Sequence, residues 1–193
     1  PTLGGAKVWA FPEITKVHPV SGKVLHEAAA GDFAKANAVW SGAEKTVRLA
    51  AARGEIVSFQ IGLNGKISDV KVKVGELSGP GKIPAGGVKL WRNWYVQNQS
   101  EYALPWTGSV SCPMDDNGIG GQTHQAVTVD IHVPTDAKAG DYTGAVTLSA
   151  GDDAVELPLK IKVYDVVLPE TIHFNPELNC YGGPGSTGSD KFN

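Results

Sequence analysis

Residues 125–165 alternate apolar and polar side chains through three consecutive stretches that short turns separate. In the first stretch Val127, Val129 and Ile131 fall on one side of an extended chain, while Thr128 and Asp130 fall on the other. The same alternation recurs in residues 142–148 and 155–163. A shift of one residue would expose the whole apolar set of a strand, so the register is strongly specified. This pattern predicts antiparallel strands that bury one face.

Further strands are predicted upstream, at residues 45–50, 55–63 and 70–74. Asn64-Gly65 lies between the last two and is expected to form a turn, because both residues tolerate a positive φ. The chain has 24 Gly and 12 Pro, which cluster between the strands as the turns of an all-β protein require. Seven to nine strands are expected, which predicts an immunoglobulin-like or fibronectin III-like antiparallel β-sandwich.

Composition excludes several classes of function. The chain has 193 residues, of which 41% are hydrophobic and 19% charged, and this suffices for one sizeable folded domain. The formal net charge is −3, and lysines alternate with core residues along the strands, so we expect no nucleic-acid partner. No run of about 18 apolar residues is present, so we expect no membrane span.

The stretch from Val88 to Gln97 differs from the other strands because it is apolar on both faces. Leu90 and Trp94 share one phase of the alternation, while Trp91 and Tyr95 share the other. An antiparallel strand of this kind needs a cover for its second face, which another domain, a loop or a ligand can provide. The stretch is therefore the best sequence-based candidate for a contact site.

Aromatic and polar residues gather in and after this stretch. The apolar C–H face of a sugar ring stacks on flat aromatic side chains, while its hydroxyl groups need polar neighbours. The predicted contact residues, for a glycan or for a neighbouring domain, are Trp91, Arg92, Asn93, Tyr95, Tyr102 and Trp106. The alternative is that Trp94 belongs to the core and the other aromatic side chains pack on a second domain.

We expect no metal site and no cofactor. The run Asp115-Asp116-Asn117-Gly118 carries oxygen ligands, but its spacing does not match a calcium-binding loop and a solvated turn is the expected alternative. No nucleophile elbow or phosphate-binding loop is present. Cys112 and Cys180 are the only cysteines, and the sequence leaves open whether they form a disulfide or two buried thiols.

Four segments together resemble a known family: Arg53–Gln60, Val129–Pro134, Ala139–Gly144 and Val167–Pro169. Their order and spacing resemble the N-terminal β-sandwich domain that precedes a (β/α)-barrel in glycoside hydrolase family 123-like secreted proteins. The resemblance covers approximately residues 45 to 181. It implies that Ile172–Tyr181 is the first strand of such a barrel.

The resemblance also implies that this chain alone is not an enzyme. In that family a catalytic Asp-Glu pair acts with assistance from an N-acetyl group of the substrate and lies on a later barrel strand, and no residue of this chain matches the pair. A complete barrel needs about 200 residues or more, far more than follow Pro169.

These observations lead to a division into three parts. Residues 1–44 are expected to form an N-terminal extension with short strands, residues 45–170 the β-sandwich, and residues 171–193 a linker and the start of a barrel. The expected function is a non-catalytic accessory domain of a secreted or extracellular carbohydrate-active protein, with the periplasm as a second location. Its expected partners are a barrel domain and a glycan. The alternative is a structural or adhesin-like interaction module without a sugar ligand.

Overall fold

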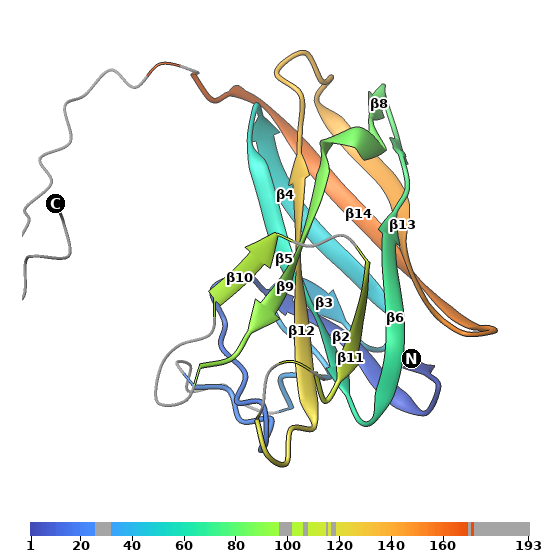
Figure 1. Ribbon diagram of the computed structural model, residues 1–193. Helices are drawn as coiled ribbons and strands as arrows, with labels where there is room; N and C mark the ends of the chain where they lie inside the picture. Colours follow the sequence, from blue (N-terminus) through green and yellow to red (C-terminus); the bar gives the residue numbers. More distant parts are fainter. Residues whose placement is uncertain are drawn as a thin grey trace, which may run out of the picture.

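The computed structural model describes residues 1–25, 32–96, 102–105, 108–114, 116, 119–169 and 171. These residues form two sheets packed face to face, so the predicted all-β sandwich is confirmed (Figure 1). The helical structure of the described part is one 3-10 turn, Ala85–Gly87. No helix of this part is long and apolar enough to span a membrane.

The first sheet contains six strands. In spatial order they are β1 (Thr2–Leu3), β2 (Ala6–Pro12), β5 (Ile56–Asn64), β12 (His124–His132), β9 (Val88–Trp94) and β10 (Tyr102–Pro105). All neighbours in this sheet are antiparallel. β12 lies between β5 and β9, and the position of β9 in the sheet therefore depends on pairing with β12 rather than on a hairpin.

The second sheet contains eight strands. Its main order is β11 (Ser109–Cys112), β6 (Ile67–Val74), β13 (Gly140–Ala150), β14 (Asp153–Val167), β4 (Thr46–Arg53) and β3 (Trp40–Ser41). The short strands β7 (Leu77–Ser78) and β8 (Lys82–Ile83) complete it. The predicted turn at Asn64-Gly65 is confirmed, since β5 ends at Asn64 and Gly65 has a φ of 121°.

One pair of strands departs from the antiparallel expectation. β4 and β14 run parallel, with Val47 beside Leu159 and Ala51 beside Val163. Parallel neighbours need a long crossover connection, and here most of the two sheets lies between these strands along the chain. A sequence pattern reports which face a strand buries but not the direction of a distant neighbour.

The core follows the predicted alternation. Val127, Val129 and Ile131 of β12 are fully buried, whereas Thr128 and Asp130 between them are partly exposed. The odd-numbered apolar residues of β14 from Leu157 to Val163 are likewise buried. Burial of each such side chain contributes about 1.5–3 kcal/mol, which makes this alternation the main source of stability.

The N-terminal residues take part in the sheets. β2 pairs with β5 from Lys7 opposite Asn64 to Pro12 opposite Phe59, and Val8 and Ala10 of β2 are fully buried. The strands that the sequence analysis assigned to an N-terminal extension therefore belong to the sandwich. Short strands at the start of a chain carry little local signal, because their stability comes from the partner strand.

The C-terminal part of the sequence prediction falls largely outside the described residues. The expected first barrel strand, Ile172–Tyr181, and Cys180 within it are not among them. Cys112 ends β11 as a buried free thiol. Burial raises the pKa of Cys112 to about 11, so this thiol is protonated and unreactive at neutral pH.

Candidate functional site

The two phases of β9 lie on opposite faces of the sheet, as the alternation predicts. Leu90 lies opposite Val129 and Arg92 opposite Val127, which places both on the face that looks toward the second sheet. Trp91 lies opposite Thr128, so its side chain is on the outer face of the first sheet. Because side chains alternate along a strand, Asn93 and Tyr95 share the outer face with Trp91.

One half of this outer face is covered by the chain itself. We call it the covered half; its members are Trp9, Phe11, Gln60, Asn93 and Tyr95, all buried. The ring centroids of Trp9 and Phe11 are 4.8 Å apart, and Phe33 meets the ring of Trp9 edge-on at 6.3 Å. Residues 12–17 and 32–40 supply the cover, which is a second small core outside the sandwich.

Gln60 is the polar centre of the covered half. Its side-chain Oε1 accepts a hydrogen bond of 2.6 Å from Nδ2 of Asn93, whose Oδ1 in turn accepts one of 2.9 Å from Thr128. Nε2 of Gln60 donates hydrogen bonds to three backbone carbonyl oxygens. These belong to Pro12, Glu13 and Thr15, at 3.1, 2.7 and 2.9 Å. These bonds attach the N-terminal loop to the sheet and satisfy polar groups that burial would otherwise destabilise.

A small hollow remains between this cover and the sheet. Trp9, Phe11, Tyr95 and His124 are among the residues that line it, and its cavity volume is about 10 Å³, which is room for about one water molecule. Pockets for small-molecule ligands usually begin at about 300 Å³. The hollow is therefore too small for a sugar ring with its hydroxyl groups.

His124 lies at the rim of this hollow. Burial lowers its pKa, and the charge of His18 lowers it further, while a hydrogen bond to the Pro19 backbone acts in the opposite direction. Gly22 packs on the ring so closely that a Cβ at this glycine would lie 2.3 Å from Nε2 of His124. Gly22 also has a φ of +68°. Both the close contact with His124 and this backbone conformation therefore favour glycine at position 22.

The other half of the outer face is open to solvent. We call it the open half; its members are Ile56 and Ser58 of β5, Asp130 and His132 of β12, and Lys89 and Trp91 of β9. Nε1 of Trp91 donates a hydrogen bond of 2.6 Å to Oδ2 of Asp130. Oδ1 of Asp130 accepts one of 2.7 Å from the Ser58 hydroxyl, so three strands contribute to one short chain of hydrogen bonds.

Arg92 lies on the opposite side of β9 from Trp91. Its Nη1 is 3.0 Å from Oδ2 of Asp116, and its guanidinium carbon is 5.2 Å from the centre of the Trp94 ring. Asp116, part of the predicted solvated turn, is thus paired with a cation. No group of three or more metal-ligating side chains occurs among the described residues.

The six predicted contact residues are therefore not brought together. Trp91 is on the open half, Asn93 and Tyr95 are buried in the covered half, and Arg92 faces the other way. Tyr102 begins β10 opposite Trp94, and Trp106 is outside the described residues. Contact of these residues with a glycan or a second domain stays a prediction. Asp130 and Ser58 were missed, because only the register of three strands places them beside Trp91.

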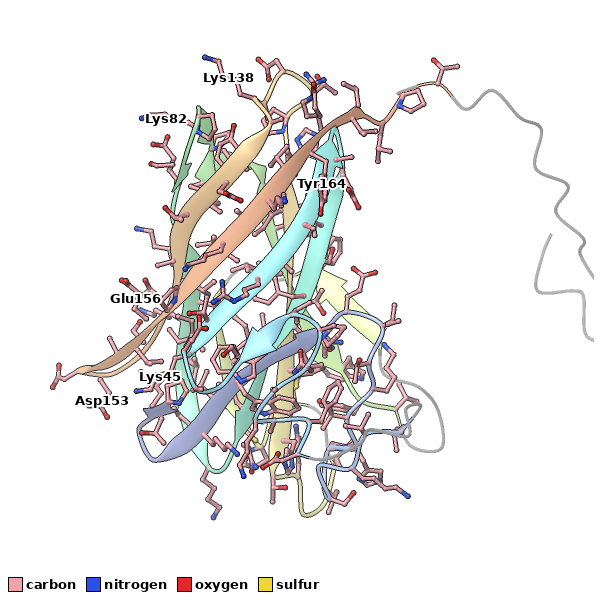
Figure 2. All side chains as sticks on the ribbon, turned by 180° about the vertical axis from the view of Figure 1, so that it is seen from behind. Lys45, Lys82, Lys138, Asp153, Glu156 and Tyr164 are labelled. Carbon is pink, nitrogen blue, oxygen red and sulfur yellow. The ribbon has the colours of Figure 1, made fainter. Side chains whose placement is uncertain are left out.

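A second exposed region lies at the end of β14. We call it the exit surface; it comprises Tyr164, Val166, Val167 and Leu168, which are 43% to 56% exposed. β13 begins at Gly140 opposite Val163, so within the described part no strand pairs with residues 164–167 on that side. Figure 2 shows Tyr164 far along β14 from Asp153, which lies at the opposite end of the strand.

β14 bulges along the exit surface. The ladder to β4 steps from Val163 beside Ala51 to Val167 beside Arg53, which leaves two extra residues in β14. Arg53 makes an ion pair of 2.7 Å with Asp165, and the backbone N–H of Leu168 donates to the carbonyl of Arg53. The bulge interrupts the alternation, so apolar side chains beyond Val163 leave the core and meet solvent.

Comparison with known proteins supports the fold but shows no family. No family model and no curated protein matches the chain. Among solved structures it is similar to a family 123 glycoside hydrolase from Clostridium perfringens, with 16% identity and a TM-score of 0.50. It is also similar to the CooA pilin subunit of enterotoxigenic Escherichia coli, with 14% identity over 84% of this chain and 99% of the pilin, but the TM-score of 0.35 carries no argument.

The match to the hydrolase covers 65% of this chain and 24% of the hydrolase. At this identity the likeness concerns the fold, and the chain spans about a quarter of the hydrolase that it matches. The structural comparison thus shows a fold similar to that of part of this hydrolase.

Proposed function

We propose that this chain is a non-catalytic accessory β-sandwich of a secreted carbohydrate-active protein, which packs against a barrel domain of the same polypeptide and contacts glycan. The single observation that carries this proposal is the exit surface. Four large apolar side chains are exposed where β14 leaves the sandwich. Contiguous exposed apolar surface marks a contact with another protein surface or with a ligand.

The difference between the two ends of β14 supports a contact of the second domain with the exit surface. The end at Asp153 carries charged residues, among them Asp152, Asp153 and Glu156, all exposed. The end at Tyr164 exposes four apolar side chains, its one charged residue, Asp165, is paired with Arg53, and within the described residues one backbone edge has no partner strand. A domain that follows in the same polypeptide meets the apolar end first, and its covalent attachment gives a high effective concentration there.

The charged residues of the sandwich favour an accessory role. A glycosidase places two carboxyl groups on either side of the scissile bond, about 5 to 10 Å apart. Asp130 accepts hydrogen bonds from Ser58 and Trp91 and has no carboxyl partner among the members of the open half. The described acidic pair Asp152-Asp153 lies on an exposed hairpin.

Hydrogen exchange tests the packing on a second domain. We expect the backbone amides of residues 164–168 to exchange at least about tenfold more slowly in the longer parent polypeptide than in this chain alone, because a docked domain excludes water. The double variant Val166→Asp, Val167→Asp should remove this protection. Ile14→Asp changes an apolar residue that is 73% exposed and lies outside the exit surface, so it is the matched control.

Equal exchange of residues 164–168 in the parent polypeptide and in the isolated chain would contradict the interdomain contact.

The second candidate function, an adhesin-like interaction module, rests on the same exit surface. It predicts that the chain alone associates at increasing concentration in sedimentation experiments. The double variant Val166→Asp, Val167→Asp should then be monomeric, whereas Trp91→Ala should associate as the unchanged chain does.

A further inference from the structure

The side chain of Trp91 is held in one orientation on the open half. Its only polar atom, Nε1, is already bonded to Asp130, and Asp130 is itself bonded to Ser58. An indole that is fixed in this way and partly exposed has no unbonded polar atom, so a ligand that reaches it meets apolar ring atoms. Its binding chemistry is therefore that of a rigid stacking surface, which costs little conformational entropy when a ligand is bound.

Polar groups surround this stacking surface. Each oxygen of the Asp130 carboxylate has spare acceptor capacity after its one observed hydrogen bond. Lys89 lies opposite Asp130 in the register and is exposed, so its flexible side chain begins beside this carboxylate and can bring an ammonium donor to a ligand there. A flat apolar face with an acceptor and a donor at its rim matches a ring that has one apolar face and several hydroxyl groups.

We propose that the open half binds a neutral saccharide, with the pyranose ring on Trp91 and its hydroxyl groups on Asp130 and Lys89. The single negative charge of Asp130 and the single positive charge of Lys89 balance, so the surface has no preference for acidic sugars. This inference rests on the proposed function only in that the ligand is a glycan. It reassigns the contact from the six residues predicted by sequence to Trp91, Asp130, Lys89 and Ser58.

Titration of the complete chain with defined sugars tests the site. The probes are lactose, cellobiose and N-acetyllactosamine, with glucuronic acid as the charged comparison, and binding is followed by calorimetry and by tryptophan fluorescence. We expect saturable binding of at least one neutral probe with a Kd of about 1 mM, typical of a single stacked ring. Glucuronic acid should bind no more tightly than the neutral sugars.

Variants locate the binding. Trp91→Ala should weaken the affinity at least about tenfold, and Asp130→Asn should weaken it about fivefold because it removes the charged acceptor. Trp91→Phe keeps an aromatic face without the hydrogen bond to Asp130 and should retain most of the affinity. Tyr164→Ala removes an exposed aromatic side chain of the other sheet and should leave binding unchanged.

Two results would overturn the proposal. One is the absence of saturable binding for every neutral probe to the folded chain. The other is an affinity that is unchanged in Trp91→Ala or, should the alanine variant not fold, unchanged in Trp91→Phe combined with Asp130→Asn, where a loss of about fivefold is expected. Neither result affects hydrogen exchange at the exit surface, so the glycan site and the interdomain contact are tested separately.

Discussion

The covered half and the open half lie on the same face of the first sheet and share β5 and β9, but one is buried and the other is open to solvent. In the covered half a polar residue, Asn93, is 2% exposed, while two residues earlier in the same strand a larger apolar residue, Trp91, is partly exposed. On hydrophobicity alone, Trp91 would be expected to be buried and Asn93 to be exposed. The difference arises because the N-terminal loop packs on one half of the face and not on the other.

The covered half also shows what burial of polar groups requires. Gln60 donates to three loop carbonyl groups and accepts a hydrogen bond from Asn93, and Asn93 in turn accepts one from Thr128, so both polar side chains can be buried. A buried polar group without partners would cost about 1–3 kcal/mol. In the open half solvent can supply missing partners, so Asp130 and Lys89 need no such network.

The largest expected effect separates the two halves directly. Phe11→Ala should lower the free energy of unfolding by about 3–5 kcal/mol, because it removes a buried ring that packs beside Trp9. Trp91→Ala, the matched change in the open half, should lower it by only about 1 kcal/mol. Urea unfolding followed by circular dichroism measures both values. Equal losses would mean that the two halves are equally buried.

A smaller effect is expected at the polar centre of the covered half. Gln60→Ala should lower the free energy of unfolding by about 2–3 kcal/mol, since it leaves Asn93 and loop carbonyl groups without their partner. Ser58→Ala, two residues earlier on the same face, should cost less than about 1 kcal/mol because the Asp130 carboxylate remains accessible to water. The comparison fails if Ser58→Ala is the more destabilising variant in the same urea experiment.

The smallest effect concerns pH at the rim of the covered half. The pKa of His124 is lowered from its ordinary value of 6.5 by burial, so the unfolded chain takes up a proton before the folded chain does. The contribution of neutral His124 to stability is therefore complete above pH 6.5 and is lost as the pH falls toward the lowered pKa. The difference in unfolding free energy between the unchanged chain and His124→Gln should shrink between about pH 7.5 and about pH 5. A difference that grows on acidification would contradict this assignment.

Sequence reasoning predicted the parts of the fold that local alternation encodes. The buried set of β12, the buried set of β14 up to Val163 and the turn at Asn64-Gly65 are confirmed. The placement of Leu90 and Trp91 on opposite faces of β9 also follows the predicted alternation. Each of these features depends on residues that are close in the chain, where the period of a strand decides which way a side chain points.

The candidate site could not be predicted in the same way. Trp91 and Asp130 are 39 residues apart, and Ser58 is 72 residues from Asp130. They meet only because β12 lies between β5 and β9 with a particular register. No periodicity within one strand contains that information, so the six residues predicted from β9 and its surroundings include two that the fold buries.

The amino-acid sequence by itself determined that this chain forms two layers of strands with a defined buried face in each. Tertiary structure alone decided that β4 and β14 run parallel, that the N-terminal loop covers only half of the first sheet, and that Trp91 meets Asp130. The physical reason is the range of the interactions: side-chain alternation acts within a strand, whereas cover, direction and hydrogen-bond partners depend on segments that are distant in the chain.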